Sequence, residues 1–124
     1  MKCIVGVSVS LEDLFSHATI NLGKQSSLIS VNLYAVIEKK LLADIALYGL
    51  YEIFPDAIDK VTNDVDNEDM IDDFVVYAKV QVMDDIKNHK LNILDCHVNK
   101  YNSLVVTVDI NFTRLWKQFK ENRK

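Results

Sequence analysis

Apolar and polar residues alternate near the amino terminus, which is the pattern of a strand with one covered face. Between Lys2 and Val9 every second residue is apolar, so these side chains share one side of an extended chain. They are Cys3, Val5, Val7 and Val9. Ser10 then begins a run with helical spacing that stops at Gly23. These patterns predict a strand over 2–9 and a capped helix over 11–22.

The middle of the chain predicts a long helix, from Leu28 to Phe54, that ends at Pro55 because proline cannot continue a helix. Its apolar side chains fall in two stripes at about 100° per residue. The wide stripe holds Ile29, Ala35, Val36, Leu42, Ala43, Ala46, Leu47, Leu50 and Ile53. The second stripe holds Leu33, Ile37, Leu41 and Tyr48. A helix that is apolar on two sides needs two partners. We therefore expect the second stripe to contact another subunit.

An acidic segment follows, from Asp56 to Asp73, with a local charge of -7. We expect a short helix over 55–61, an exposed loop over 62–67 and then a helix capped by Asn67. The core stripe of this last helix would be Ile71, Phe74, Val75, Ala78, Val82 and Ile86. A strand is the alternative for residues 68–89, because Val76, Ala78, Val80 and Val82 also alternate.

The carboxy-terminal part predicts an antiparallel β-hairpin, because two alternating runs flank a short polar connection. Both apolar sets reach one face only in one register. It pairs Val98 with Leu104, Cys96 with Val106 and Leu94 with Val108. The loop is then Lys100-Tyr101-Asn102, with Asn102 in the left-handed conformation.

Thr113 is expected to cap a final short helix with the apolar residues Leu115, Trp116 and Phe119. Residues 114–124 carry a local charge of +4. This basic helix could be a solvated face, a local nucleic-acid contact with an aromatic partner, or a surface that docks on the acidic segment of a neighbouring copy. Docking would involve two sets of residues. They are Asp64, Asp66, Glu68 and Asp69, and Arg114, Trp116, Lys117 and Lys120.

Length and composition indicate a single domain over residues 1–124, and the elements predicted above make it an α+β domain. The expected elements are an amino-terminal strand, a long central helix with further helices, and a carboxy-terminal hairpin with a short basic helix. The chain is 49% hydrophobic and 26% charged, as in globular proteins. A net charge of -4 argues against a general nucleic-acid-binding surface. We expect no membrane span, because charges interrupt the apolar region 28–54, and no secretory signal peptide.

No catalytic, cofactor-binding or metal site is predicted. The run Asp64 to Asp69 resembles the start of a calcium loop, but Asp69 occupies the glycine position and Val75 the position of the bidentate glutamate. Cys3 and Cys96 lack the spacing of a zinc site or a disulfide framework. The histidines His17, His89 and His97 have no expected catalytic partner, since Cys96 and His97 point to opposite faces of their strand.

Residues Met70 to Phe112, a helix followed by the segments 90–98 and 102–110, resemble the helix-plus-hairpin module of small virion proteins of tailed bacteriophages. These include baseplate-wedge and head-to-tail connector proteins. The resemblance implies a non-enzymatic subunit of a ring or collar, located in the virion or the host cytoplasm.

Two functions of different class follow. The first is a structural subunit of a homo-oligomeric ring or a larger complex with other structural proteins. The alternative is a small acidic monomeric module that binds or inhibits a basic protein partner. An enzyme ranks third, and a pocket with converging polar groups would favour it.

Overall fold

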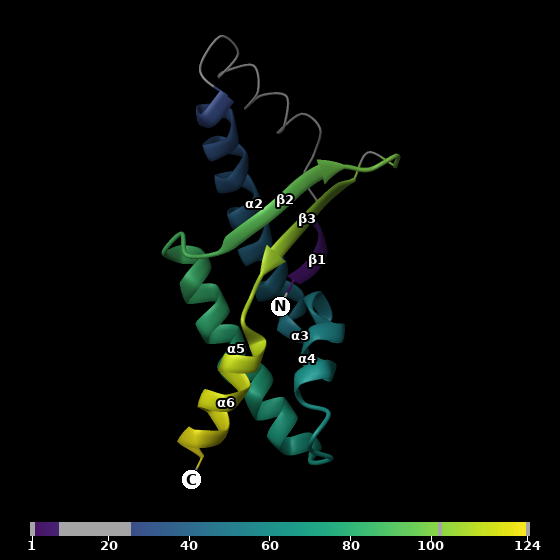
Figure 1. Cartoon of the computed structure of the whole chain (residues 1–124), viewed down its shortest axis with the longest axis vertical. Helices are drawn as coiled ribbons and strands as arrows, with labels where there is room; N and C mark the ends of the chain where they lie inside the picture. Colours follow the sequence, from purple (N-terminus) through teal and green to yellow (C-terminus); the bar gives the residue numbers. More distant parts are fainter. Residues whose placement is uncertain (1, 8–25, 102, 124) are drawn as a thin grey trace.

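An antiparallel three-stranded sheet crosses the long helix α2, and the remaining helices extend below it (Figure 1). The computed structural model describes residues 2–7, 26–101 and 103–123. For residues 26–33 it describes the backbone and not the side chains. The strands are β1 (Lys2–Val7), β2 (Asn92–Val98) and β3 (Leu104–Asp109), in the spatial order β1-β3-β2. The amino-terminal strand therefore pairs with the second strand of the carboxy-terminal hairpin.

Five helices accompany the sheet in the described part of the chain. They are α2 (Ser26–Tyr48), α3 (Leu50–Ile53), α4 (Pro55–Val61), α5 (Glu68–Lys87) and α6 (Phe112–Asn122). The expected α+β fold is confirmed. The short helix over 55–61 has the predicted bounds, and residues 68–87 are helix rather than strand.

Strand β1 has the predicted alternation. Cys3, Val5 and Val7 are buried while the residues between them are exposed. Their partners across the antiparallel ladder are Val108, Val106 and Leu104, so the inner face of the sheet is built from both ends of the chain. Val9 and the helix expected over 11–22, with His17, lie outside the described residues.

The hairpin has two of the three predicted pairs, Val98 with Leu104 and Cys96 with Val106. The third was wrong. Ile93, not Leu94, pairs with Val108, because the register shifts between Ile93 and Asp95. An extra residue in one strand restores the inward direction of the next side chain, and Leu94 is left 44% exposed. Asn102 lies outside the described residues.

The single helix expected from Leu28 to Phe54 was wrong, because the chain breaks at Gly49. Its φ of 90° and ψ of 157° lie in a region that is nearly exclusive to glycine. The Gly49 amide still donates to the Ile45 carbonyl at 2.9 Å, so α2 is closed normally before α3 leaves in a new direction. Pro55 then occupies the first turn of α4, where its missing amide hydrogen costs nothing.

The inward face of α2 contains two members of the second stripe, Ile37 and Leu41, together with Ile45, which was assigned to neither stripe. Ile37, Leu41 and Ile45 are 0% exposed, so the expectation that Ile37 and Leu41 face another subunit was wrong. Branched side chains of this volume fill the space between a helix and a sheet, whereas alanines at those positions would leave voids. The alanines consequently face outward.

Helix α5 begins at the predicted cap. The Asn67 Oδ1 accepts a hydrogen bond from the Met70 amide at 3.2 Å, which satisfies one of the free amides of the first turn. The residues that α5 buries are Phe74, Ala78, Val82 and Ile86. The expected stripe was therefore correct in its centre, while Ile71 and Val75 at its border are only half-buried.

Helix α6 is capped by Asn111 rather than Thr113. Its Oδ1 accepts from the Arg114 amide at 3.0 Å, and Phe112 enters the core as the first helical residue. The Phe112 ring lies 5.6 Å from that of Phe54, so this buried residue fixes where the helix starts. The cap therefore falls two residues earlier than expected. In the part of the chain that the structure describes, no helix combines the length and the apolar character needed to cross a membrane.

Candidate interaction surfaces

The basic helix and the acidic segment do meet, but within one chain. The Lys120 Nζ donates to Asp64 Oδ2 at 3.2 Å, and Arg123 Nη1 donates to Asp73 Oδ2 at 2.9 Å. The Trp116 Nε1 donates to the second oxygen of Asp64, also at 3.2 Å. The hydrogen bond from Lys120 holds the pKa of Asp64 below its ordinary value. The expectation that Asp64, Trp116 and Lys120 contact a neighbouring copy was therefore wrong, because they contact each other within one chain.

The aromatic side chains of α6 are part of the core. Trp116 is 4% and Phe119 7% exposed. The Phe74 ring packs edge-on against Trp116 at 5.0 Å between centroids and lies 5.6 Å from Phe119. Rings enclosed in this way have no free face on which a nucleotide base could stack.

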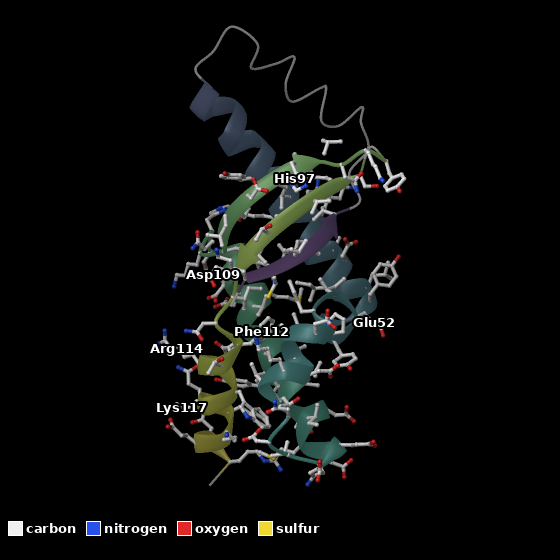
Figure 2. All side chains as sticks on the ribbon, turned by 45° about the vertical axis from the view of Figure 1, so that its right-hand side comes forward. Glu52, His97, Asp109, Phe112, Arg114 and Lys117 are labelled. Atoms are coloured by element: carbon white, nitrogen blue, oxygen red, sulfur yellow. The ribbon has the colours of Figure 1, made fainter. Side chains whose placement is uncertain are left out.

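The remaining charged residues of the predicted docking sets stay at the surface. They are Asp66, Glu68, Asp69, Arg114 and Lys117. None of them takes part in an ion pair with another residue that the structure describes. Arg114 and Lys117 project from the side of α6 that faces away from α4 (Figure 2).

The outward face of α2, which we define as Ala35, Lys39, Ala43, Ala46 and Leu47, is exposed along its length. Leu47 is 73% exposed and Tyr48, at the end of the helix, 60%. Tyr48 is thus the member of the predicted second stripe that is exposed. The side chain of Leu33 lies outside the described residues.

A second apolar surface, the α3–α5 groove, lies where α3 and α4 meet the first half of α5. Its volume is about 550 Å³. It is lined by Tyr51, Asp59, Glu68, Ile71, Asp72, Val75 and Val76. Apolar side chains form most of the surface. The three charged residues of the lining, Asp59, Glu68 and Asp72, are all acidic. Val76 is 65% exposed.

One hydrogen bond fixes a wall of this groove. The Tyr51 hydroxyl donates to Asp59 Oδ1 at 2.8 Å, which joins α3 to α4 and holds the phenol ring in place. The same bond raises the pKa of Tyr51 above its ordinary value. Glu68 and Asp72 stand one helical turn apart on α5, and neither forms an ion pair with any other described residue.

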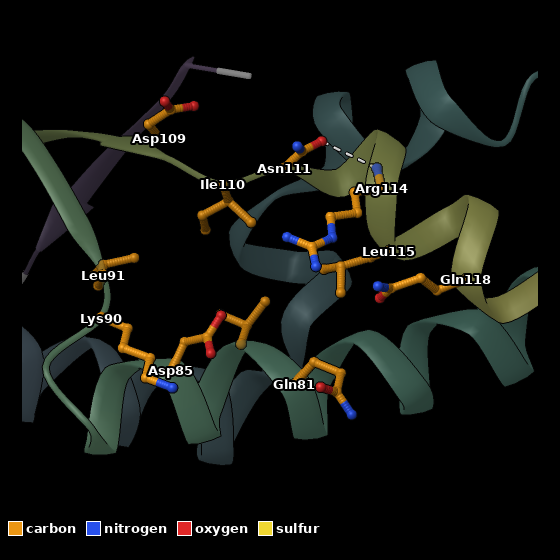
Figure 3. A pocket seen from close by; sticks show the side chains of 11 residues that line it. Gln81, Asp85, Lys90, Leu91, Asp109, Ile110, Asn111, Arg114, Leu115 and Gln118 are labelled. Carbon is orange, nitrogen blue, oxygen red and sulfur yellow. Dashed lines mark hydrogen bonds between the residues drawn. The ribbon is translucent and has the colours of Figure 1, made fainter.

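A polar pocket of about 450 Å³ lies between α5, the end of β3 and α6 (Figure 3). Arg114 reaches into it from α6 and Asp85 from α5, and Lys90 and Asp109 also line it. Its other polar members are the amide side chains Gln81, Asn111 and Gln118. Charges of both signs can bind a polar molecule, but the lining holds no nucleophile with an adjacent base.

Each histidine that the structure describes is exposed and lies beside a carboxylate. His89 Nδ1 lies 2.9 Å from Glu38 Oε2, and His97 Nδ1 lies 3.0 Å from Asp95 Oδ2. His89 has a φ of 57° as the left-handed residue after α5. Each pair joins one base to one carboxylate at the surface, and neither lines a pocket described above.

The two described cysteines are not in a disulfide, and Cys3 is buried while Cys96 is half-buried. Burial raises the pKa of both thiols, which lowers the reactive thiolate fraction at neutral pH. Among the described residues, no three His, Cys, Asp or Glu side chains converge as metal ligands. The acidic loop in particular directs Asp64 to α6.

The α3–α5 groove was missed by the sequence analysis. Tyr51 was not assigned to either stripe of the central helix, and Val76 was assigned only to the rejected strand. The one available signal was the spacing on α5, where Glu68, Asp72, Val76 and Val80 follow each other at intervals of four residues.

Comparison with known proteins gives no relative: no family model matches the chain, and no match is found among curated proteins or solved structures. The similarity to bacteriophage virion proteins stays a prediction from the sequence pattern.

Proposed function

We propose that this protein is a non-enzymatic subunit of a protein assembly, and that the outward face of α2 contacts other subunits. The observation that carries the proposal is the exposure of Leu47, at 73%, beside Ala43 and Ala46. Leucines at a helix surface gain free energy when a partner covers them. Neighbouring alanines allow a second helix to approach closely, because interaxial distance depends on the side chains at the contact.

The expected partners are copies of this chain or other structural proteins. Lys39 lies one turn from Ala43 on the outward face of α2, so a partner helix must place an acceptor or water beside it. The resemblance of residues 70–112 to subunits of rings and collars supports the same class of function.

The test is the mass of the protein in solution, measured by light scattering after size exclusion from micromolar to submillimolar concentration. We expect a multiple of 14.2 kDa and a shift toward the protomer mass for Leu47→Glu. Because Leu47 is exposed, this substitution should change the free energy of unfolding by no more than about 0.5 kcal/mol.

The matched control is Glu121→Gln, an exposed position on α6, which should keep the assembled mass. A protein that stays at 14.2 kDa at every concentration, at low and at physiological salt, would contradict self-assembly through this face.

A further inference from the structure

We infer that the α3–α5 groove binds a short amphipathic segment of a partner protein, with apolar side chains on one face and Lys or Arg beside them. This goes beyond the proposed function and does not rest on it, because the groove uses other residues than the outward face of α2.

The floor of the groove supplies the apolar half of the argument. Val76 is 65% and Tyr51 39% exposed. Ile71 and Val75 are half-buried, and Val75 also packs against the core. The Tyr51 ring is held by its hydrogen bond to Asp59, so this wall is already ordered before a partner arrives. Preorganised apolar surface binds with a smaller loss of conformational entropy than a mobile surface.

The rim supplies the charge. Asp59, Glu68 and Asp72 are the only ionisable carboxyl groups in the lining, and the lining contains no cationic residue. On the other side of the acidic segment, Asp64 and Asp73 already have Lys120 and Arg123 as partners. Glu68 and Asp72 have none among the described residues. A cationic partner is therefore favoured over an acidic or neutral one.

The dimensions favour a peptide segment. From Glu68 to Val76 the groove follows two turns of α5, about 12 Å at 1.5 Å per residue, which matches two turns of a second helix. One or two apolar anchors would fill it, as in other complexes in which a helix lies in a groove.

The basic helix α6 of a second copy fits the groove less well. The exposed cations of α6 are Arg114 and Lys117, but Trp116 and Phe119, the large apolar residues of that helix, are enclosed by their own chain. The helix could offer charge without an anchor. Two grooves facing each other would also place like charges together.

Three synthetic peptides of about 14 residues, roughly four helical turns, test the inference by calorimetry. One combines Leu and Lys in an amphipathic pattern, one replaces each Lys by Glu, and one replaces each Leu by Ser. We expect binding of the Leu/Lys peptide alone, weakened by added salt. Chemical shift changes in nuclear magnetic resonance spectra should centre on Ile71, Val75 and Val76.

Substitutions in the groove distinguish the contribution of its acidic rim to peptide binding from that of its apolar floor. The double substitution Glu68→Lys with Asp72→Lys should weaken binding of the Leu/Lys peptide about tenfold or more, and Val76→Ser should weaken it several-fold. Glu121→Lys, an exposed charge reversal on α6, should leave it unchanged. Thermal unfolding monitored by circular dichroism verifies that each variant is folded.

Two results would overturn the inference. The Ser/Lys peptide could bind as tightly as the Leu/Lys peptide, which would mean that charge alone attracts it. The Glu68→Lys, Asp72→Lys protein could keep full affinity, which would place the peptide elsewhere. Neither result bears on the assembled mass, so self-assembly through α2 is judged separately.

Discussion

The two sides of α5 contain similar residues in opposite situations. On the inner side Phe74 lies under Trp116 and Phe119, and Asp73 pairs with Arg123. On the other side Val76 is exposed, and Asp72 has no ion-pair partner among the described residues. Both sides of α5 therefore carry apolar and acidic residues. On one side these residues contact α6 of the same chain, and on the other, the open side, they are left at the surface.

The comparison shows that local charge does not tell whether a segment is free to bind a partner. The acidic segment has a charge of -7 and the basic helix +4, and sequence reasoning treated both as free. Long-range ion pairs, such as that of Asp64 with Lys120, which are 56 positions apart, separate the part used for folding from the part left at the surface. The contacts that stabilise the fold thus lie on one side of α5, and the surface that we propose to bind a partner lies on the other.

The largest expected effect comes from truncating the inner side. Phe74→Ala removes a ring that is 0% exposed and leaves a cavity under two aromatic side chains. We expect a loss of about 3–5 kcal/mol in the free energy of unfolding, measured by urea titration with the fluorescence of Trp116. The matched change on the open side, Val76→Ala, should cost less than about 1 kcal/mol. Equal losses would mean that the two sides are packed alike.

A smaller effect is expected at the break that turns the chain from α2 to α3 and so positions Tyr51. Gly49→Ala places a Cβ where no atom lies within 4 Å, so the cost is conformational only. At a φ of 90° and a ψ of 157° it should be about 1–3 kcal/mol. Gly6→Ala is the control, since its Cβ would also meet nothing within 4 Å and its backbone is an ordinary strand. A stable Gly49→Ala protein would mean that the break relaxes into a continuous helix.

Much of the fold could be predicted because its signals are local. Asn67 before an acidic first turn indicated where α5 starts, and alternation indicated two of the hairpin pairs, because a one-residue slip would expose an entire strand. The cap of α6 was misplaced at Thr113, because Asn111 and Thr113 are both good capping residues and the choice depends on Phe112 entering the core.

The surfaces could not be predicted in the same way. The two stripes of α2 were identified, but which one faces inward depends on the volume that the sheet leaves to be filled, and Ile37 and Leu41 fill it. The α3–α5 groove joins Tyr51 to Val76, which are brought together by the break at Gly49 and by the packing of α3 on α5. No spacing rule within one element contains that information.

The smallest expected effect is on how the free energy of unfolding depends on pH through Asp64. The Lys120 hydrogen bond lowers the pKa of Asp64 from its ordinary value of 3.8, so the folded state binds this proton less readily than the unfolded state. Stability from Asp64 is therefore present above pH 3.8 and is lost as the pH falls through the lower folded value. Asp64→Asn should therefore flatten the acid side of the stability curve in urea titrations. Because Asp64 is exposed and screened by solvent, the change should be small, and an acid side as steep as that of the unsubstituted protein would contradict a contribution of this ion pair to stability.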